Sequence, residues 1–518
     1  MFLISRIICF PEEFEDLFAN IFWRLVIVVY IDSAIFYYRV LTHRSIFASF
    51  RNVLSLPIVT TTFVYINKIL QMVYDFVILG GGIAGLYTAY QLLQKNPDSK
   101  LLLLEKSALL GGRIHTYKDK YMSVEAGAGR FHSGHIRLLA LIHDLGLSSR
   151  IINIETGFTY KPVSASGSAS GSASVSGAGA GSEPDPSSLI RPILRESKKT
   201  DIETLRNQSF LDFAKTVVSV AEVQFIEDSF GYYTELVSMN AHDALYLMSE
   251  HLSGKHQFHV LSGGLSQLID ALETKLRGYG DGVTILKRHE VETLRCHAWS
   301  SADSVTNVTV EKFEIVCKGI AKKYYGRVLI GALPKQVLEK IPMFRPLKPV
   351  FEQIICGPLC RIYSKFSLDA SGQPWFHDLS KITTNNKLRM VIPVNTSQGI
   401  LMSSYTDNKF AKYWKRLYDR DLRAGSSRCV EEQLRRQLEE TTGKTVPEPI
   451  VTRVFYWDCG VGYWGVGANS AEISRMVIQP FEHNVFLCGE HFSEKNQQWI
   501  EGALETSSKV ISAIFLKK

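Results

Sequence analysis

The sequence YDFVILGGGIAGL, residues 74–86, predicts a buried β-strand that ends in a glycine-rich turn and continues directly into a helix. Residues 74–79 are mostly β-branched, aromatic or aliphatic, which is typical of a buried strand. Residues 80–85 fit the pattern Gly-x-Gly-x-x-Gly, and residues 86–94 carry apolar side chains at helical spacing. A second strand is predicted at Lys100–Glu105, so an acid follows the last glycine by 20 residues. This order and spacing predict a dinucleotide-binding βαβ unit.

The three glycines of the pattern and the helix that follows have separate roles in forming a phosphate site. Gly80 permits the tight turn, Gly82 lets backbone N–H groups approach a pyrophosphate, and Gly85 lets the helix pack closely on the strand. The helix N-terminus, with Ile83 and Ala84, presents free N–H groups and a positive dipole end to the anion.

The residues after the second strand add further cofactor contacts. Glu105 is expected to accept hydrogen bonds from ribose hydroxyls, and Lys106 lies next to it. Gly111, Gly112 and Arg113 follow, and an arginine beside two glycines can bind phosphates from a second side. The glycine pattern alone does not distinguish NAD from FAD.

The C-terminal part of the chain repeats the same physical arrangement. Residues 484–488 predict a strand, and Gly489-Glu490 ends it. Trp499-Ile500-Glu-Gly-Ala503 then begins a closing helix, whose N-terminus can stabilise an electron-rich atom.

These segments together resemble the flavin-containing amine oxidases, the family of monoamine oxidase, polyamine oxidase and L-amino-acid oxidase. The resemblance covers roughly residues 73–518 and is most specific at its two ends. It implies an α/β fold, in which a discontinuous Rossmann-like FAD-binding domain is interleaved with an α+β substrate domain. The implied cofactor is noncovalent FAD, because the surroundings of Cys459 differ from the family's flavin-linking cysteine motif.

The resemblance also implies where the domains divide. The expected FAD-binding domain consists of residues 73–135, 256–340 and 455–518, and the expected substrate domain of residues 136–255 and 341–454. Within the substrate domain we expect helices at 210–239 and 427–441.

Several cofactor contacts follow from the resemblance alone. Glu490 would meet the ribityl or pyrophosphate region, and the helix start at Trp499 and Ile500 would face the flavin C2 carbonyl and N1. The backbone of Val291 would hold the adenine.

Substrate contacts are expected in front of the flavin. Trp499 falls where the family places an aromatic wall, and Tyr463 and Trp464 are expected on the approach to the same face, with Trp457 near them. Aromatic faces would shape a slot for a neutral amine and exclude water.

Two arginines complete the expected site. Gly129-Arg130 resembles a segment of L-amino-acid oxidases in which the arginine lies near flavin and substrate carboxylate, so Arg130 is a cofactor contact or a carboxylate clamp. Many family members have a lysine bonded through water to flavin N5. The best register places Arg361 there, whereas Lys365 would need a shifted alignment.

Two segments lie outside the resemblance. Residues 1–71 contain two interrupted apolar runs that fit neither a transmembrane helix nor a signal peptide. We expect either that Met72 is the natural start or that residues 1–71 are a dispensable extension. The alternative is a membrane-associated anchor. Residues 160–190 are rich in Ser, Ala and Gly, and predict a flexible insert.

Composition excludes several other classes of protein. With 46% hydrophobic and 21% charged residues, the chain is neither disordered throughout, collagen-like nor a multi-span membrane protein. A net charge of +7 over 518 residues is too dilute to indicate nucleic-acid binding. Its 8 cysteines are scattered, which predicts free thiols in a reducing compartment and hence a cytoplasmic protein. Cys356 and Cys360 have no second ligand pair, so no metal is expected.

The resemblance implies the reaction as well. A hydride would pass from an amine carbon to flavin N5, the imine would hydrolyse to a carbonyl and ammonia, and O2 would reoxidise the flavin to give H2O2. The expected partners are a small amine or amino acid and O2. We identify no side-chain base in the sequence.

Three alternatives remain open. One is another flavoprotein on this fold, such as a desaturase or porphyrinogen oxidase. The second is a flavin-binding protein that has lost turnover, and the third is an NAD-dependent dehydrogenase, against which Gly112-Arg113 and Gly489-Glu490 argue.

Overall fold

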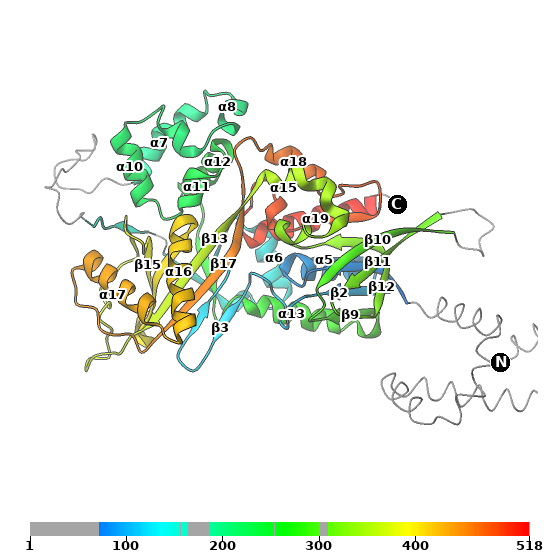
Figure 1. Cartoon of the computed structure of the whole chain (residues 1–518), viewed down its shortest axis with the longest axis horizontal. Helices are drawn as coiled ribbons and strands as arrows, with labels where there is room; N and C mark the ends of the chain where they lie inside the picture. The colour runs from blue at the N-terminus through cyan, green and yellow to red at the C-terminus, as the bar shows by residue number, and fades with distance from the viewer. Residues whose placement is uncertain (1–71, 156, 164–185, 253, 301–308, 517–518) are drawn as a thin grey trace, which may run out of the picture. The chain divides into compact units, whose positions relative to one another are not determined.

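The computed structural model describes residues 72–155, 157–163, 186–252, 254–300 and 309–516 (Figure 1). The expectations for residues 1–71, and for most of the insert at 160–190, lie outside these residues. Residues 186–190 of the expected insert belong to a helix, α7 (Pro186–Ser197).

A 7-stranded sheet forms the first half of the structure, and strand β1 lies near its middle. Strand β1 is parallel to β2, to β12 and, through β12, to β18. The strands run in the order β10 (Val291–Ser300), β11 (Thr309–Cys317), β12 (Lys323–Gly331), β1 (Val73–Leu79), β2 (Leu101–Leu104) and β9 (Val283–Leu286), with β18 (Val485–Leu487) paired to β12.

Both faces of this sheet are buried because its central strands are apolar on both sides. In β1, Phe76 and Ile78 pack into one core, whereas Val77 and Leu79 pack into another. Successive side chains of a strand point to opposite faces, and a continuous apolar run therefore needs a cover on each face. The expected strands at 74–79 and 100–105 are confirmed with small shifts of their ends.

Helices cover one face of the first sheet. The N-terminal helix contacts two others, one of which closes the C-terminal part of the chain. These helices are α5 (Ile83–Lys95), α6 (Ile136–Asp144), α13 (Ser266–Arg277) and α19 (Ile500–Leu516). Figure 1 shows α5 and α13 beside β2 and β9. The other face packs against α14 (Lys335–Leu338), α15 (Lys348–Glu352) and α18 (Ser470–Met476), with 3₁₀ turns that include Pro342–Leu347.

A 6-stranded sheet forms the second half. Its strands run in the order β17 (Val451–Trp464), β13 (Ile354–Lys365), β16 (Ile400–Asp407), β15 (Met390–Asn395), β14 (Ile382–Thr383) and β7 (Thr159–Tyr160). Helices α16 (Asn408–Ala424) and α17 (Arg428–Thr442) lie against it (Figure 1). Strand β17 contributes residues 451–464 to this sheet, although we expected residues from 455 onward in the FAD-binding domain.

Side chains of β13 alternate between the two faces of the second sheet. Cys360 and Ile362 are buried in the core under α16 and α17. Arg361 and Tyr363 point to the other face, where they line a cavity. One strand therefore supplies both core and site because its side-chain period is 2.

Residues 210–239 form three short helices, so the expected single helix is wrong. Ser219 and Glu222 form a capping box that starts a new helix, and Gly231 lies between the second and third. The third helix is held by Asp407 of β16, which accepts hydrogen bonds from two backbone N–H groups at its start. The helices of this region are α8 (Ile202–Arg206), α9 (Phe210–Ala214), α10 (Val220–Ser229), α11 (Tyr233–Val237) and α12 (Ala241–Leu252).

The structure also contains two small sheets. They consist of β3 (Thr116–Lys118) with β4 (Ser123–Glu125), and of β5 (Phe131–His132), β8 (Phe258–Leu261) and β6 (Ile151–Ile154). Among the described residues, no helix combines the length and the apolar character that crossing a membrane requires.

The fold predicts that Gly85 tolerates no side chain. A Cβ on Gly85 would lie 2.0 Å from the backbone oxygen of Gly80, so β1 and α5 would have to separate. We expect Gly85→Ala to lower the free energy of unfolding by on the order of 3 kcal/mol, as overpacking of a rigid contact does. Urea unfolding of the full chain measures this.

A glycine in open surroundings gives the control. A Cβ on Gly282 would lie 3.6 Å from the nearest atom, an ordinary contact, and we expect Gly282→Ala to change stability by less than about 0.5 kcal/mol. Equal unfolding midpoints for the two variants would contradict the close packing of β1 and α5.

Candidate active site

A cavity of about 1360 Å³ lies where the two sheets meet. One wall consists of residues at the carboxyl ends of parallel strands: Gly80 after β1, Glu105 after β2, Ala332 after β12 and Gly489 after β18. Ligands of open α/β sheets bind at this edge. Pockets for one drug-sized ligand span about 300–1,000 Å³, so the cavity has room for a dinucleotide and a small substrate.

The glycine turn has the shape that a phosphate cradle requires. Gly80 has φ +105°, and a Cβ there would lie 2.5 Å from the oxygen of Ala332. A Cβ on Gly82 would meet only the oxygen of Gly111, at 4.0 Å, so the backbone of Gly82 faces open space. Gly82 is the N-cap of α5 and has no side-chain cap, so N–H groups of the first helical turn remain available to an anion.

Glu105 has a structural role besides its place in the cavity wall. Its carboxylate accepts hydrogen bonds from the backbone N–H of Gly81, at 2.8 Å, and from both N–H and hydroxyl of Ser107. The acid at the end of β2 therefore also fixes the glycine turn at the end of β1.

Arg113 and Glu490, which both line the cavity, form an ion pair. Burial alone would raise the pKa of Glu490, but Arg113, His491 and the backbone N–H of Gln498 outweigh it and hold this pKa well below its usual range. Arg113 also donates to the oxygen of Gly460 at 3.1 Å. The pair thus connects the N-terminal motif, the C-terminal motif and strand β17.

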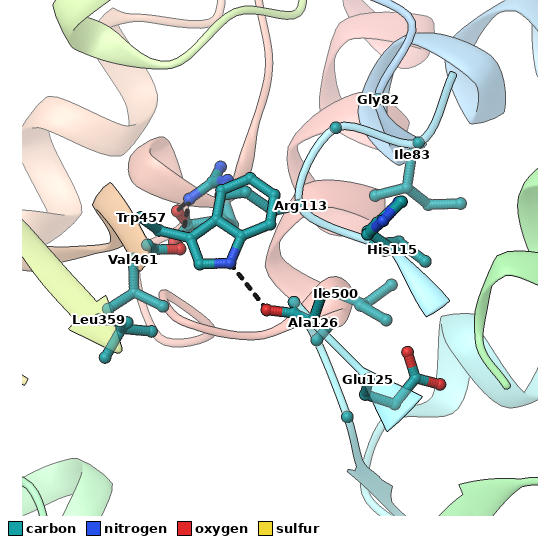
Figure 2. A pocket seen from close by; sticks show the side chains of 18 of the residues that line it. Gly82, Ile83, Arg113, His115, Glu125, Ala126, Leu359, Trp457, Val461 and Ile500 are labelled. Carbon is teal, nitrogen blue, oxygen red and sulfur yellow. Dashed lines mark hydrogen bonds and ion pairs between the residues drawn. The ribbon is translucent and has the colours of Figure 1, made fainter. Parts of the chain in front are cut away.

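Trp457 projects from β17 into the same cavity. Its indole N–H donates to the oxygen of Ala126 at 2.7 Å. Figure 2 shows Trp457, Val461 and Leu359 on one side of the cavity, with Gly82 and Ile83 on the other.

Most of the predicted site residues line this cavity. They are Gly80, Gly82, Ile83, Ala84, Glu105, Lys106, Gly111, Gly112, Arg113, Gly129, Arg130, Val291, Arg361, Tyr463, Gly489, Glu490, Trp499 and Ile500. Gly85 lies behind the turn and serves packing. Trp464 is fully buried, and its indole N–H donates to the oxygens of Ser493 and Glu494, so it packs in the core and does not reach the cavity.

Arg130 lies among aromatic side chains in the cavity wall. Its guanidinium stacks over Phe258, 4.9 Å from the ring centre, and lies 5.9 Å from the ring centre of Trp499. It donates to the hydroxyl of Tyr232 at 3.0 Å. These contacts fix the orientation of the side chain, and cation–π attraction adds to them.

Arg361 is held by neutral groups. It donates to the backbone oxygen of Glu125 at 3.0 Å and lies 4.6 Å from the ring centre of Tyr405. Lys365 instead donates to the oxygen of Tyr121 and is not part of the cavity wall. The structure therefore places Arg361 at the site and Lys365 outside it.

Sequence reasoning missed further residues of the wall, among them Tyr232, Glu235, Tyr363 and Tyr405. These four come from the entry to α11, from α11, from β13 and from β16, segments with no motif. The alternation of β13 was the only available signal, because Tyr363 follows Arg361 by two residues and must face the same way.

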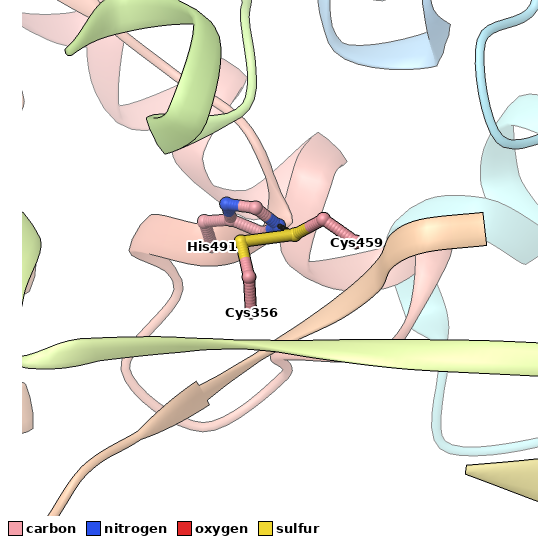
Figure 3. Close-up of side chains that lie close together, drawn as sticks. All are labelled: Cys356, Cys459 and His491. Carbon is pink, nitrogen blue, oxygen red and sulfur yellow. Dashed lines mark hydrogen bonds between the residues drawn. A yellow bond between two sulfur atoms is a disulfide. The ribbon is translucent and has the colours of Figure 1, made fainter. Parts of the chain in front are cut away.

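The prediction of free thiols is wrong for two cysteines. Cys356 of β13 and Cys459 of β17 form a disulfide, with His491 next to it (Figure 3). The two strands are neighbours in the sheet, and a bulge between them brings the sulfurs together. Cys459 lines the cavity. Because a disulfide is rare in a reducing compartment, the cysteines no longer support a cytoplasmic location.

Comparison with known proteins agrees with this geometry. The family model described as flavin containing amine oxidoreductase matches residues 83–510. The uncharacterized protein R188 of Acanthamoeba polyphaga mimivirus is 21% identical over 490 residues, which cover 84% of this chain and 93% of that protein.

Two solved structures share the fold. Wild-type putrescine oxidase bound to putrescine superposes with a TM-score of 0.65 at 15% identity, covering 86% of this chain and 100% of that one. Cyclohexylamine oxidase from Brevibacterium oxydans gives a TM-score of 0.63 at 13% identity, with the same two coverages.

We predict that Arg113 is needed to keep Glu490 charged. Arg113→Met leaves a buried carboxylate without its cation, and we expect a loss of roughly 3–5 kcal/mol in the free energy of unfolding at neutral pH. A carboxyl with a lowered native pKa stabilises the fold above its unfolded pKa and loses this contribution as the pH falls. Arg113→Met raises that native pKa, so acid destabilisation should begin at higher pH than in the wild type. Urea unfolding as a function of pH measures both effects.

The exposed pair between Arg327 and Asp75 provides the control. These two side chains are 59% and 32% exposed, so Arg327→Met should cost less than about 1 kcal/mol. A similar cost for both variants would contradict the role of the buried pair.

The disulfide is directly testable. Digestion without reduction, after alkylation of free thiols, should give one linked pair of peptides containing Cys356 and Cys459, and reduction should separate them. Alkylated Cys360 in the same digest serves as the free-thiol control. Complete alkylation of Cys356 and Cys459 before reduction would contradict the bond.

Proposed function

Because the chain belongs to the family of flavin-containing amine oxidoreductases, we propose that it oxidises the carbon–nitrogen bond of a small amine or amino acid to an imine. The imine hydrolyses to a carbonyl compound and ammonia, and O2 is the electron acceptor. The cofactor is FAD, and the chain is an amine-oxidase-like oxidoreductase. The observation that carries the proposal is that a single cavity connects the phosphate-binding turn with an aromatic, charged pocket.

The residues present fit FAD. The open backbone at Gly82 and the N-terminus of α5 would hold the pyrophosphate, Glu105 the ribose, and Val291 the adenine end. The start of α19 at Ile500 would bring a second helix N-terminus to the electron-rich edge of the ring. We propose noncovalent binding, because the one cysteine of the cavity wall, Cys459, is already bonded to Cys356.

The protein's own part in the reaction is to position the substrate and to exclude water. The chemistry that FAD would supply when bound is acceptance of a hydride from the amine carbon and reoxidation by O2. Tyr463 and Trp499 shape the slot in which the C–H bond is oriented. Arg361 cannot release a proton at physiological pH, but it can hold a water molecule by donation.

We further propose the two domains that the sequence suggested, with changed boundaries. Helices α6 and α15, which we expected in the substrate domain, pack on the first sheet and belong with the FAD-binding domain. The first sheet and its helices form the FAD-binding domain, and the second sheet with α7–α12 forms the substrate domain. Residues 451–464 belong with the substrate domain, because β17 pairs with β13 along its whole length.

The test is an absorption spectrum of the purified full chain, followed by anaerobic addition of amines and amino acids. We expect the absorption bands of a flavin. We also expect the band near about 450 nm to disappear when at least one of these compounds is added. Bands that no compound bleaches would favour a protein without turnover. A product other than a carbonyl compound would favour a different flavoprotein oxidase. A colourless protein that stays colourless after addition of FAD would contradict the cofactor.

Arg361→Lys tests the role of the second-sheet arginine. A lysine can exchange a proton with a bound water, which a guanidinium cannot. We expect reoxidation by O2 to become faster by about tenfold, equivalent to about 1.4 kcal/mol, measured by stopped-flow mixing of the reduced protein with O2. Lys365→Arg is the control outside the cavity. An unchanged reoxidation rate would show that Arg361 does not act on this step.

A further inference from the structure

Glu235 is a carboxyl group in the cavity wall for which the proposed reaction has no use. It lies on α11 and is 2% exposed, yet it is one of the residues that line the cavity. Its Oε2 is completely buried and has no hydrogen-bond partner among the described residues. An unpartnered buried oxygen of this kind costs free energy and requires an explanation.

The other buried carboxyl groups near the cavity are all satisfied. Asp407 accepts from the backbone N–H groups of Tyr233 and Thr234. Glu125 accepts from the N–H of Leu265 and the hydroxyl of Thr116. Glu105 and Glu490 have backbone and side-chain partners as described above. Among these acids, Glu235 alone has a carboxylate oxygen without a hydrogen-bond partner.

The surroundings of Glu235 combine charges of both signs. Burial and, after it, the nearby Asp407 raise its pKa to about 8, and Arg130 opposes this rise. Tyr232 and Tyr463 also lie within its electrostatic reach. Arg130 forms no ion pair with Glu235 in the described structure and is hydrogen-bonded to Tyr232. Within the part of the chain that the structure describes, no cation therefore neutralises this carboxylate directly.

We propose that Glu235 is a recognition site for a cationic nitrogen of the substrate, an ammonium or amidinium group that enters the cavity and pairs with the spare carboxylate oxygen. This inference rests on the proposed function only for the identity of the substrate as an amine. Amines carry a proton at neutral pH, with pKa values near that of lysine, about 10.4, so an amine arrives as a cation. A buried carboxylate and a cation in a dry cavity attract each other more strongly than in water.

Binding also moves one proton. Below pH 8 the carboxyl of free Glu235 is mostly protonated. When a cation binds, the O–H bond of the carboxyl breaks, its proton leaves to solvent, and the carboxylate forms the ion pair. Cation affinity should thus rise with pH up to about 8 and then level off, because only the ionised acid pairs.

Two molecules of the same shape test this site. Benzamidine is a cation with no oxidisable C–H beside its nitrogens, and benzamide is its neutral counterpart. With the full-length holoprotein at pH 9, we expect calorimetry to show benzamidine binding at least tenfold more tightly than benzamide. At pH 7 this preference should shrink, and benzamidine binding should release a proton, visible as a heat that depends on the buffer.

Glu235→Gln keeps the shape of the side chain but not its charge. We expect this variant to bind both molecules equally and to release no proton at pH 7. The control is Asp458→Asn, which removes an exposed carboxylate of the same cavity wall and should keep the preference. A preference that survives in Glu235→Gln would overturn the proposal.

The outcomes separate this proposal from the proposed function. Benzamidine can bind whether or not any amine is oxidised, so selective binding without bleaching would support the site and contradict turnover. If an amine bleaches the flavin but the protein does not prefer benzamidine over benzamide, turnover would be supported and the recognition site contradicted. If Glu235→Gln does not fold, the wild-type pH profile decides alone, and a preference unchanged between pH 7 and pH 9 would overturn the proposal.

Discussion

The ion pair between Arg113 and Glu490 is the interaction on which the arrangement of the cavity depends. It joins the beginning and the end of the nucleotide-binding part, which are 377 residues apart in sequence. Through Gly460, whose oxygen accepts from Arg113, and Gly462, whose N–H donates to Glu490, the same pair binds strand β17 of the second sheet. A buried pair of this kind adds little net stability over apolar packing, but breaking it leaves a buried carboxylate without its cation. It therefore specifies the position of three segments more than it strengthens any of them.

The two walls of the cavity are built by different means. The first sheet contributes backbone: glycines, strand ends and helix N-termini that approach a ligand closely because side chains are absent there. The second sheet contributes side chains, since alternate residues of β13 and β16 point away from the helices that cover its other face. Backbone donors suit phosphate groups, which all dinucleotides share. Side chains suit discrimination among ligands, and so the wall from the second sheet is the one that mutation can alter without changing the fold.

Sequence alone predicted the first wall and little of the second. The glycine turn, Glu105, Arg113 and Glu490 were predictable because phosphate binding constrains both residue type and spacing. Glu235 was not, since it lies on a five-residue helix in a region whose apolar pattern suggested one long helix; the break depends on the cap at Ser219 and on Asp407, which is far away in sequence. Trp464 shows the opposite error: its neighbour Tyr463 faces the cavity, so strand alternation turns Trp464 into the core. The disulfide was not predicted because two cysteines that are 103 residues apart leave no local pattern in the sequence.

That disulfide closes part of the chain into a covalent ring. The ring consists of residues 356 to 459, which include β14, β15 and β16 and the covering helices α16 and α17. The disulfide that closes it lies beside the cavity. A single cut in any exposed loop of the ring, such as the one between α16 and α17, would leave both fragments attached. The second sheet could therefore be nicked and still hold its strands in register. A protein of this design can survive partial proteolysis with its site intact, as long as the bond between the two sulfurs remains.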